Sequence, residues 1–347
     1  MRLSFYSFGT TYGGYGITGI QIAKHLTRLG VDVRFHPEFA PMVGSNEWKL
    51  LDDEEKKLFE KPFEVCRLGL NQTTPWEFHK NQSEVKLAIT MAESDRLGSE
   101  WVKACNGMNR IIVPNKFFKQ VFQDSGVSVP INIIPYGVDT ERYGFVIRKT
   151  KEVYTFGSCG YLNDRKGALE LIQAFTSEFG PDEPVRLRLH STSGYFGYYK
   201  HLSDPRIEVT TDLWHPDELV KFYHDLDCFV FPSRAEGVGM PPREAMSTGL
   251  PVILMNYSGL ADVASPDFSY PLEPDGFEDR LGMAEQPGKW AKINIPQLMY
   301  WMRHVYENKG AAKTKGVIAS QVMRQKYSWP ICAQRLKEYL EIVKEQL

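Results

Sequence analysis

Short apolar segments alternate with amphipathic ones along the chain, a pattern that predicts strands followed by helices. Leu3–Phe8 is an apolar, strand-like segment that ends at a run of glycines. Ile17–Leu29 then carries apolar residues at helical spacing, Gly30 stops the helix, and Val31–Phe35 has the composition of a second strand. The chain is therefore predicted to begin with a βαβ unit.

The same order recurs in the second half of the chain. Val153–Gly157 and Cys228–Phe231 are predicted strands. Each precedes a predicted helix, Ala168–Phe175 after the first and Pro242–Thr248 after the second. Because strands alternate with helices in both halves, we predict an α/β protein with two parallel, doubly wound sheets.

The chain length of 347 residues fits two domains. We expect the first domain to cover residues 1–146 and the second to cover 147–329, with a charged stretch at the boundary. Residues 330–347 are a predicted amphipathic helix that joins the first domain. Two polar stretches, Asp52–Lys57 and Pro271–Gly288, are expected to be solvated surface without chemistry.

The composition gives the chain no net positive charge that could attract a polyanionic partner over a long distance. Lys and Arg (41) nearly balance Asp and Glu (43), so nucleic acid or an anionic membrane would need a local basic patch. The five cysteines are widely spaced and include no C-x-x-C pair, which predicts reduced thiols and no zinc site. No secretory signal or membrane span is predicted, and we therefore expect a cytoplasmic protein.

Gly9–Gly16 follows the first predicted strand and leads into a helix, which is where parallel sheets bind anions. Gly14, Gly16 and Gly19 also fit G-x-G-x-x-G. Glu38 lies downstream of this motif, at the position where dinucleotide-binding enzymes have an acidic residue that binds the ribose. Two interpretations stay open: the glycines let the backbone approach a diphosphate, or they form a structural turn.

Gly157–Gly167 occupies the corresponding position in the second half and contains Arg165 and Lys166. Paired cations at a helix N-terminus stabilise the charge that develops on a leaving diphosphate. The alternative is that both side chains are solvated surface charges.

A third segment, Ser233–Met246, holds two carboxylates. Glu236 falls in the loop and Glu244 in the first turn of the helix, so we expect both to face one crevice. Such a pair suits recognition of a polyol, because a carboxylate accepts hydrogen bonds from two hydroxyls. Gly237 and Gly239 let backbone N–H groups reach the same ligand. The alternative is that Glu244 caps the helix and Glu236 is exposed.

With these residues the chain resembles the nucleotide-sugar-dependent retaining glycosyltransferases of family 4, among the glycosyl transferases of group 1. That family has the GT-B fold, two Rossmann-like lobes that face each other across a cleft. The resemblance runs along most of the chain. The matching segments are Gly13-Gly14, the interdomain turn Ile134–Asp139, Lys166-Gly167, the two glutamates Glu236 and Glu244, and Gly249–Ile253.

The resemblance implies that Glu236 orients the transferred sugar, Glu244 binds the donor ribose and Lys166 binds the diphosphate. It also implies an acceptor-binding first lobe, a donor-binding second lobe and retention of anomeric configuration. No cofactor or metal is required, since Lys166 and Arg165 take the place of a metal cation. The expected donor-binding residues are Gly13, Gly14, Gly16, Gly160, Tyr161, Gly237, Val238, Gly239, Met240 and Glu244.

Two positions depart from the family pattern. Tyr161 stands where relatives usually carry an Arg beside a glycine, and Arg165 is the expected substitute. The segment Leu68–Trp76 lacks the His that many relatives carry in the acceptor lobe. The candidate acceptor-side residues are Gln72, His79, Glu93 and Asp95.

The sequence thus predicts a retaining, metal-independent hexosyl- or pentosyltransferase whose partners are a nucleotide sugar and an acceptor hydroxyl. The acceptor stays open among a glycan, a lipid-linked sugar, a small metabolite and a modified nucleic-acid base. A catalytically weak sugar-nucleotide-binding protein is one alternative, and a nicotinamide-dependent oxidoreductase is a less favoured one. Peripheral membrane contact through Phe117–Lys119 or Arg142–Lys151 also stays open.

Overall fold

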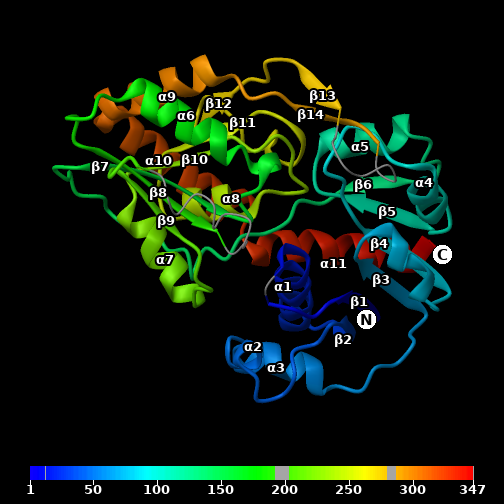
Figure 1. Ribbon diagram of the computed structural model, residues 1–347. Helices are drawn as coiled ribbons and strands as arrows, with labels where there is room; N and C mark the ends of the chain where they lie inside the picture. The colour runs from blue at the N-terminus through cyan, green and yellow to red at the C-terminus, as the bar shows by residue number, and fades with distance from the viewer. Residues whose placement is uncertain (12, 192–202, 280–286, 347) are drawn as a thin grey trace. The chain divides into compact units, whose positions relative to one another are not determined.

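The computed structural model describes residues 1–11, 13–191, 203–279 and 287–346 (Figure 1). These residues form two compact units. The first unit contains Met1–Gly137 and Lys326–Leu347, together with Met283–Pro287, of which only Pro287 is described. The second contains Val138–Gly282 and Gly288–Gln325. Within the described ranges no helix combines the length and apolar character needed to cross a bilayer.

The first unit is built on a six-stranded sheet in the order β2-β1-β3-β4-β5-β6, with every neighbouring pair parallel. Its strands are β1 (Arg2–Phe8), β2 (Asp32–Glu38), β3 (Leu68–Gln72), β4 (Val85–Ile89), β5 (Arg110–Val113) and β6 (Ile131–Ile133). The order changes direction between β1 and β3, which is where open parallel sheets bind ligands at their carboxyl edge.

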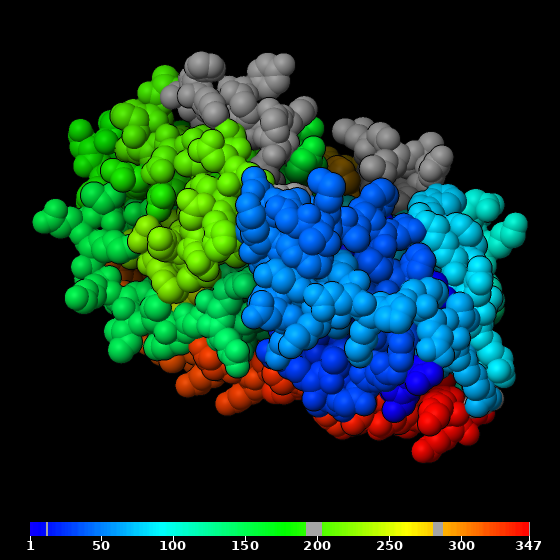
Figure 2. All heavy atoms as spheres, turned by 90° about the horizontal axis from the view of Figure 1, so that it is seen from below, coloured from blue at the N-terminus to red at the C-terminus, as the bar shows by residue number. Residues whose placement is uncertain are grey.

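Helices cover this sheet: α1 (Gly14–Arg28), α2 (Asn46–Lys49), α3 (Asp53–Glu60), the 3₁₀ helix η1 (Pro75–Lys80), α4 (Ser99–Asn106), α5 (Lys116–Asp124) and α11 (Trp329–Gln346). The C-terminal helix α11 contacts α1 and buries Leu336, Leu340 and Val343. Figure 2 shows the red C-terminal residues at the surface of the molecule. Gly137 allows the chain to pass close to this helix, because an added Cβ would lie 2.5 Å from the Trp329 ring.

The second unit repeats the plan with a parallel sheet in the order β12-β11-β10-β7-β8-β9. Its strands are β7 (Tyr154–Gly160), β8 (Val185–Ser191), β9 (Ile207–Thr210), β10 (Cys228–Phe231), β11 (Val252–Met255) and β12 (Tyr270–Leu272), and a hairpin is added by β13 (Phe277–Asp279) and β14 (Lys289–Ala291). The prediction of two parallel, doubly wound sheets is confirmed.

The helices of the second unit are η2 (Asp164–Lys166), α6 (Ala168–Glu178), α7 (Pro216–Asp225), α8 (Met240–Ser247), η4 (Ser258–Leu260), α9 (Ile295–Glu307) and α10 (Lys309–Lys326). Helices α6 and α9 pack against each other (Figure 1). Gly249 follows α8 with a φ of 80°, the left-handed conformation that ends helices at glycine. Five buried cysteines lie in the two units, all as free thiols.

Strand β7 continues beyond the predicted end at Gly157 to Gly160. Ser158, Cys159 and Gly160 pair with residues of β8. Gly157 pairs with Arg188 of β8 and Phe229 of β10, and glycine is needed there because an added Cβ would lie 2.4 Å from the side chain of Leu226. The glycine that suggested the end of the strand therefore serves packing inside the sheet.

Residues 138–146, expected in the first domain, pack within the second unit. The Ser247 hydroxyl donates to the carbonyl of Tyr143 at 2.8 Å. The Val146 N–H donates to the carbonyl of Thr248 at 3.2 Å. The ring of Phe145 lies 2.6 Å from the position of an added Cβ on Gly249. These contacts place the change of unit at Gly137/Val138 instead of 146/147.

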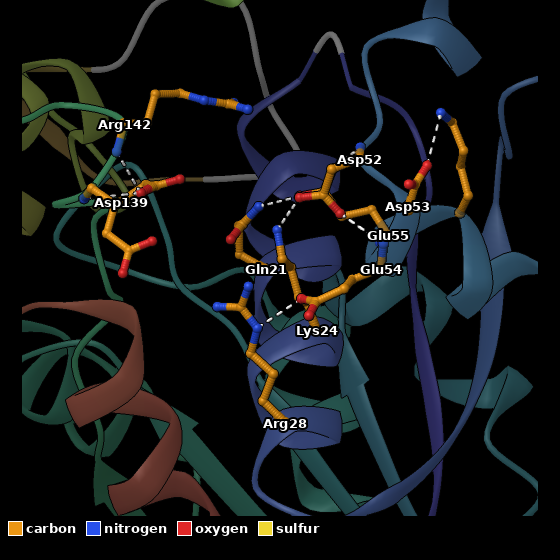
Figure 3. A network of polar contacts seen from close by, with 11 residues as sticks. Gln21, Lys24, Arg28, Asp52, Asp53, Glu54, Glu55, Asp139 and Arg142 are labelled. Carbon is orange, nitrogen blue, oxygen red and sulfur yellow. Dashed lines mark hydrogen bonds and ion pairs between the residues drawn. The ribbon is translucent and has the colours of Figure 1, made fainter.

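The expectation that Asp52–Lys57 is solvated is wrong for Glu55, which is 4% exposed. Its carboxylate accepts hydrogen bonds from Gln21 at 2.7 Å and from Lys24 at 3.2 Å (Figure 3). Lys24 also pairs with Asp52, which caps the N-terminus of α3. The charge run thus joins α3 to α1 through a buried lysine, an arrangement that a stretch of alternating charges does not reveal.

The expectation of a surface excursion over Pro271–Gly288 is wrong at its start. Pro271 and Leu272 belong to the edge strand β12, and Leu272 is fully buried. A proline fits there because, among the described strands, β12 pairs with β11 alone and so forms an edge of the sheet. The following Phe277–Asp279 forms β13, and residues 280–286 lie outside the described residues.

Candidate functional site

Two loops meet at the carboxyl edge of the second sheet. One joins β7 to η2 and the other joins β10 to α8, and β7 and β10 are neighbouring parallel strands. The Arg234 N–H donates to the carbonyl of Arg165 at 2.8 Å. The Ser233 hydroxyl lies 3.3 Å from the same carbonyl oxygen. Uncharged contacts to the carbonyl of Arg165 therefore hold the two loops together.

Glu236 is the centre of the side-chain contacts in this region. It is 5% exposed. Its Oε1 accepts from the Lys166 ammonium group and forms an ion pair with Arg165, whose Nη1 lies 3.1 Å away. The Ser233 hydroxyl donates to the same oxygen at 2.5 Å. Lys166 also lies over the Phe231 ring, with Nζ 4.9 Å from the ring centroid. Two cations thus share one buried carboxylate.

The charge state of Glu236 follows from this environment. Burial by itself would raise the pKa of the carboxyl group, since it disfavours the ionised form. The charges of Lys166 and Arg165 act against burial and hold the pKa of Glu236 below its usual value. The carboxylate is therefore ionised at neutral pH, and both of these cations come from the segment that follows β7.

Backbone contacts fix the position of Glu236. Its N–H donates to Ser258 Oγ at 2.8 Å, and its carbonyl accepts from the Gly259 N–H at 2.9 Å. Ser258 has a φ of 54°, which is rare for a residue with a side chain. Gly259 is required because an added Cβ would lie 2.3 Å from the carbonyl oxygen of Gly237. The residue with the unusual backbone conformation, Ser258, is thus the one that accepts the hydrogen bond from the Glu236 N–H.

The interpretation of Arg165 and Lys166 as solvated surface charges is wrong. Their side chains are 13% and 8% exposed. Besides contacting Glu236, Arg165 donates to the carbonyl of Ala235 at 2.5 Å. Tyr161, in contrast, is 57% exposed and follows Gly160, whose φ of 129° is open to glycine alone. The structure therefore places Arg165, and not Tyr161, at the buried carboxylate.

Glu244 lies in a different environment from Glu236. It is half-buried on α8, and its Oε2 accepts a hydrogen bond from the Tyr223 hydroxyl of α7 at 2.8 Å. Burial raises the pKa of Glu244 to about 7, while hydrogen bonds from Tyr223 and Tyr143 oppose the rise. One glutamate is thus held ionised and the other titrates near neutrality.

Arg148 holds the two helices that carry Tyr223 and Glu244. Its Nη1 donates to three backbone carbonyls at the C-terminal end of α7, those of Tyr223, His224 and Leu226, at 3.0–3.1 Å. Its Nη2 donates to the hydroxyl of Thr248, the C-cap of α8, at 2.6 Å. A guanidinium group suits this position because it offers five donors to helix carbonyls that lack partners.

The segment from Gly237 to Met240 turns the chain into α8. Gly239 has a φ of 73°, and an added Cβ would lie 2.2 Å from Leu260. Val238 is buried, and its carbonyl accepts from Arg243 at 3.2 Å. Arg243 is 1% exposed and pairs with Asp262 at 2.8 Å. The buried Arg243 side chain thus links the loop before α8 to Asp262. A single Arg in a predicted helix does not indicate this role.

In the first unit, the glycines of the Gly9–Gly16 loop fall into two groups. Added Cβ atoms would lie 1.9 Å from the Thr10 carbonyl oxygen at Gly16 and 2.0 Å from the Ser7 hydroxyl at Gly19. At Gly14 there is nothing within 4 Å, and at Gly13 only a methyl group of Thr10 at 4.0 Å. Packing within the unit therefore accounts for Gly16 and Gly19, but not for Gly13 and Gly14.

Nearby carboxylates of the first unit are already engaged. Glu47 accepts from the Thr10 hydroxyl at 2.7 Å and from the Thr11 N–H at 2.5 Å, which ties α2 to the glycine loop. Glu38, the acid expected in a dinucleotide site, forms an ion pair with Lys80.

The four acceptor-side candidates lie in different settings. Gln72 is fully buried and contacts Ser7, Thr18 and Tyr136 through its amide. His79 is exposed, and its Nδ1 lies 2.8 Å from a backbone oxygen of η1. Glu93 is half-buried, and its charge adds to burial in raising the pKa of Tyr15. Asp95 is exposed.

These four positions could not be ranked from sequence, because burial decides which polar groups a ligand can reach. Sequence reasoning also missed Tyr143, Tyr223, Arg148 and Ser258, whose partners are distant in the chain. Among the described residues, no group of three or more His, Cys, Asp and Glu side chains gathers as a metal site.

Comparison with known proteins supports a relation to sugar transferases. Residues 153–280 match the family model described as Glycosyl transferases group 1, which confirms the resemblance to group 1 over that segment. The lipopolysaccharide 1,2-N-acetylglucosaminetransferase of Salmonella typhimurium is 24% identical over 257 residues. That match covers 67% of this chain and 62% of the relative, so the chain spans less than two thirds of the relative's length.

Solved structures share the fold at low sequence identity. Sucrose-phosphate synthase from Thermosynechococcus elongatus superposes with a TM-score of 0.74 at 14% identity, covering 100% of both chains. Anabaena Alr3699/HepE, in complex with UDP and glucose, gives a TM-score of 0.70 at 16% identity and covers 98% of this chain and 99% of that one. The chain therefore has the GT-B fold.

Proposed function

We propose that the protein is a retaining glycosyltransferase that moves a sugar from a nucleoside-diphosphate sugar to an acceptor hydroxyl. The observation that carries the proposal is the sharing of one buried carboxylate, Glu236, by Lys166 and Arg165 at the carboxyl edge of the second sheet. A diphosphate needs preorganised positive charge as its bond to the sugar breaks. The family match over residues 153–280 supports the same class of reaction.

In the proposed reaction, the bond between the anomeric carbon and the β-phosphate oxygen breaks, and its electron pair goes to that oxygen. Lys166 and Arg165 stabilise the charge that develops there. The acceptor hydroxyl forms a new bond on the face that the diphosphate leaves, and its proton passes to a phosphate oxygen. The products are the glycosylated acceptor and a nucleoside diphosphate, and no protein base is required.

The remaining site residues have proposed roles in holding the donor. Ionised Glu236 accepts hydrogen bonds from the transferred sugar, and Glu244 accepts from the donor ribose. Gly237, Val238, Gly239 and Met240 supply backbone N–H groups at the start of α8. Gly160 and Tyr161 border the donor at the carboxyl end of β7.

We further propose that the reaction needs neither a cofactor nor a metal ion. The two cations on Glu236 supply the charge that a divalent ion supplies in other sugar transferases. The relative from Salmonella is named for a lipopolysaccharide, and we therefore propose a glycan or lipid-linked sugar as the acceptor class.

Transfer assays with a panel of nucleotide sugars and glycan acceptors test the proposal. We expect release of a nucleoside diphosphate, a mass gain on the acceptor, retained anomeric configuration by NMR and full activity in EDTA. Inverted product would contradict the retaining mechanism, and loss of activity in EDTA would contradict the proposed metal independence. Donor binding without hydrolysis or transfer would favour the sugar-nucleotide-binding alternative, while a nicotinamide-dependent oxidoreductase would bind NAD instead.

A further inference from the structure

A pocket in the second unit lies at the opposite edge of the sheet from the proposed donor site. It is lined by Arg148, Thr150, Lys151, Tyr154, Asp227, Pro251, Lys309 and Lys313. Tyr154 is the first residue of β7, Asp227 directly precedes β10, and Pro251 directly precedes β11. These are the amino-terminal ends of the strands, whereas the loops that carry Lys166 and Glu236 follow the carboxyl ends of β7 and β10.

The lining of this pocket is strongly positive. Four of its eight residues are cations, and Asp227 is the single carboxylate among them. The Asp227 carboxylate accepts the Thr155 N–H at 2.9 Å and lies 4.0 Å from Lys151 Nζ. One acid therefore faces four bases, which leaves an excess of three positive charges on a small surface.

The lysines of α10 contact neutral groups instead of carboxylates. Lys313 Nζ donates to the Thr150 hydroxyl at 3.1 Å, and Lys309 Nζ lies over the Tyr154 and Tyr306 rings at 5.5 and 4.7 Å. Within the described part of the chain, neither lysine forms an ion pair. Their ammonium groups thus keep hydrogen-bonding capacity for an anion.

The position of these lysines on α10 adds to the positive potential. The helix begins at Lys309 and runs for 18 residues, and its first turn contains no acidic residue. The N-terminal end of a helix carries a partial positive charge, so lysines there destabilise the helix unless an anion lies nearby. Arg148 adds a guanidinium charge whose pKa burial lowers to about 10. An anion next to the pocket would stabilise the lysines at the helix N-terminus and the charged form of Arg148.

We propose that the basic rim of this pocket binds a phosphoryl group at the surface, with Lys309 and Lys313 as the direct ligands. The same chemistry is presented by free phosphate and by the headgroup of an anionic phospholipid. Ile147, which is 88% exposed, and the exposed Lys149 adjoin the pocket through Arg148, an arrangement that suits a lipid surface. The site is independent of the proposed sugar transfer.

The test measures binding by the full chain, with saturating UDP present to occupy the proposed donor site. One arm titrates inorganic phosphate by calorimetry. The other sediments vesicles of phosphatidylcholine with and without phosphatidylglycerol. The variant Lys309→Gln/Lys313→Gln is compared with Lys221→Gln/Lys315→Gln, which removes two charges from α7 and α10 outside the pocket. Thermal unfolding checks that both variants fold.

We expect binding in at least one arm. Its affinity should fall at least about tenfold in the pocket variant and less than about twofold in the control, because only the pocket variant loses charge-assisted hydrogen bonds to the anion. Binding to phosphate identifies a free anion as the source, and binding to phosphatidylglycerol vesicles alone identifies the lipid. The proposal is overturned if neither ligand binds or if the two variants lose affinity equally. It is also overturned if phosphate binds only when UDP is left out, which would place that anion at the donor site. None of these outcomes depends on transfer activity.

Discussion

The ammonium group of Lys166 and the carboxylate of Glu236 form a buried ion pair whose two partners lie seventy residues apart in sequence, on neighbouring loops of one sheet edge. Taking both charges out of water is costly. The pair persists because Arg165 forms a second ion pair with the carboxylate and Ser233 donates a hydrogen bond to it. A protein that needed only stability could fill this space with apolar side chains. The pair is therefore best explained by a ligand that uses the charges.

The first prediction concerns Lys166. Its replacement by Ala removes one preorganised charge from the leaving diphosphate, and we expect turnover at saturating donor to fall about 10²–10³-fold. Glu236 keeps Arg165 and Ser233 as partners, so the fold should survive, with Tm recorded as a check. Near-wild-type turnover would show that Lys166 does not contact the diphosphate.

The second prediction separates Arg165 from Tyr161. Because Arg165 shares Glu236 with Lys166 while Tyr161 is exposed, we expect Arg165→Ala to lower turnover about as much as Lys166→Ala. Tyr161→Phe should be mild, and Tyr161→Arg should be tolerated. A loss below about threefold for Arg165→Ala, under ~0.7 kcal/mol of transition-state stabilisation, would leave Lys166 as the only cation acting on the diphosphate.

The third prediction distinguishes the two glutamates by kinetics. Glu236→Gln removes the ionised group that contacts the sugar at the reacting carbon, so we expect kcat to fall. Glu244→Gln changes a ribose contact, so we expect a higher KM for the donor with kcat largely kept. Steady-state kinetics with varied donor decide the matter, and equal effects of both substitutions on both constants would contradict the assigned roles.

The fourth prediction concerns the strained Ser258. Both Ser258→Gly and Ser258→Ala remove the hydroxyl that accepts from the Glu236 N–H, but only glycine adopts a φ of 54° without strain. We expect Ser258→Ala to lower the free energy of unfolding by about 1 kcal/mol more than Ser258→Gly does. Denaturant unfolding of the two variants measures this difference, and an Ala variant as stable as the Gly variant would argue against strain at this position.

Local patterns in the sequence were sufficient for the fold and for the identity of the central ionic residues. Alternation of apolar segments predicted both sheets, the segment Gly157–Gly167 pointed to Arg165 and Lys166, and the segment Ser233–Met246 pointed to Glu236. The burial of Glu55 in α3 was not predicted, because its partner Lys24 belongs to another helix. Tertiary burial overrides a local charge pattern in such cases.

The environment of Glu244 could not be predicted for the same reason. Tyr223, Tyr143 and Arg148 come from three separate segments, and none has a recognisable spacing to α8. A sequence motif can locate a carboxylate, but its pKa depends on which hydroxyls and charges the fold brings near it.

The last prediction follows from the raised pKa of Glu244 and concerns the pH dependence of stability. Its ordinary pKa of 4.5 is raised to about 7 by burial, so the folded protein binds this proton more tightly than the unfolded chain does. The contribution to stability is fully present below about pH 4.5 and is lost as the pH rises through about 7. Between these values the free energy of unfolding should fall more steeply in the wild type than in Glu244→Gln, by at most about 1.4 kcal/mol per pH unit.

The same titration should control donor binding, because ribose hydroxyls donate to the ionised carboxylate. Tyr143, Arg142 and Asp139 also face Glu244, and only the tyrosine and the arginine lower its pKa. We expect the KM for a nucleotide sugar to fall as the pH rises through about 7.

Tyr223→Phe removes a hydroxyl that lowers the pKa of Glu244 and should therefore shift the midpoint of the KM profile to higher pH. Tyr270→Phe removes a buried hydroxyl elsewhere in the sheet and should leave the midpoint unchanged. If both tyrosine variants keep the wild-type profile, Glu244 is not the group that titrates in donor binding.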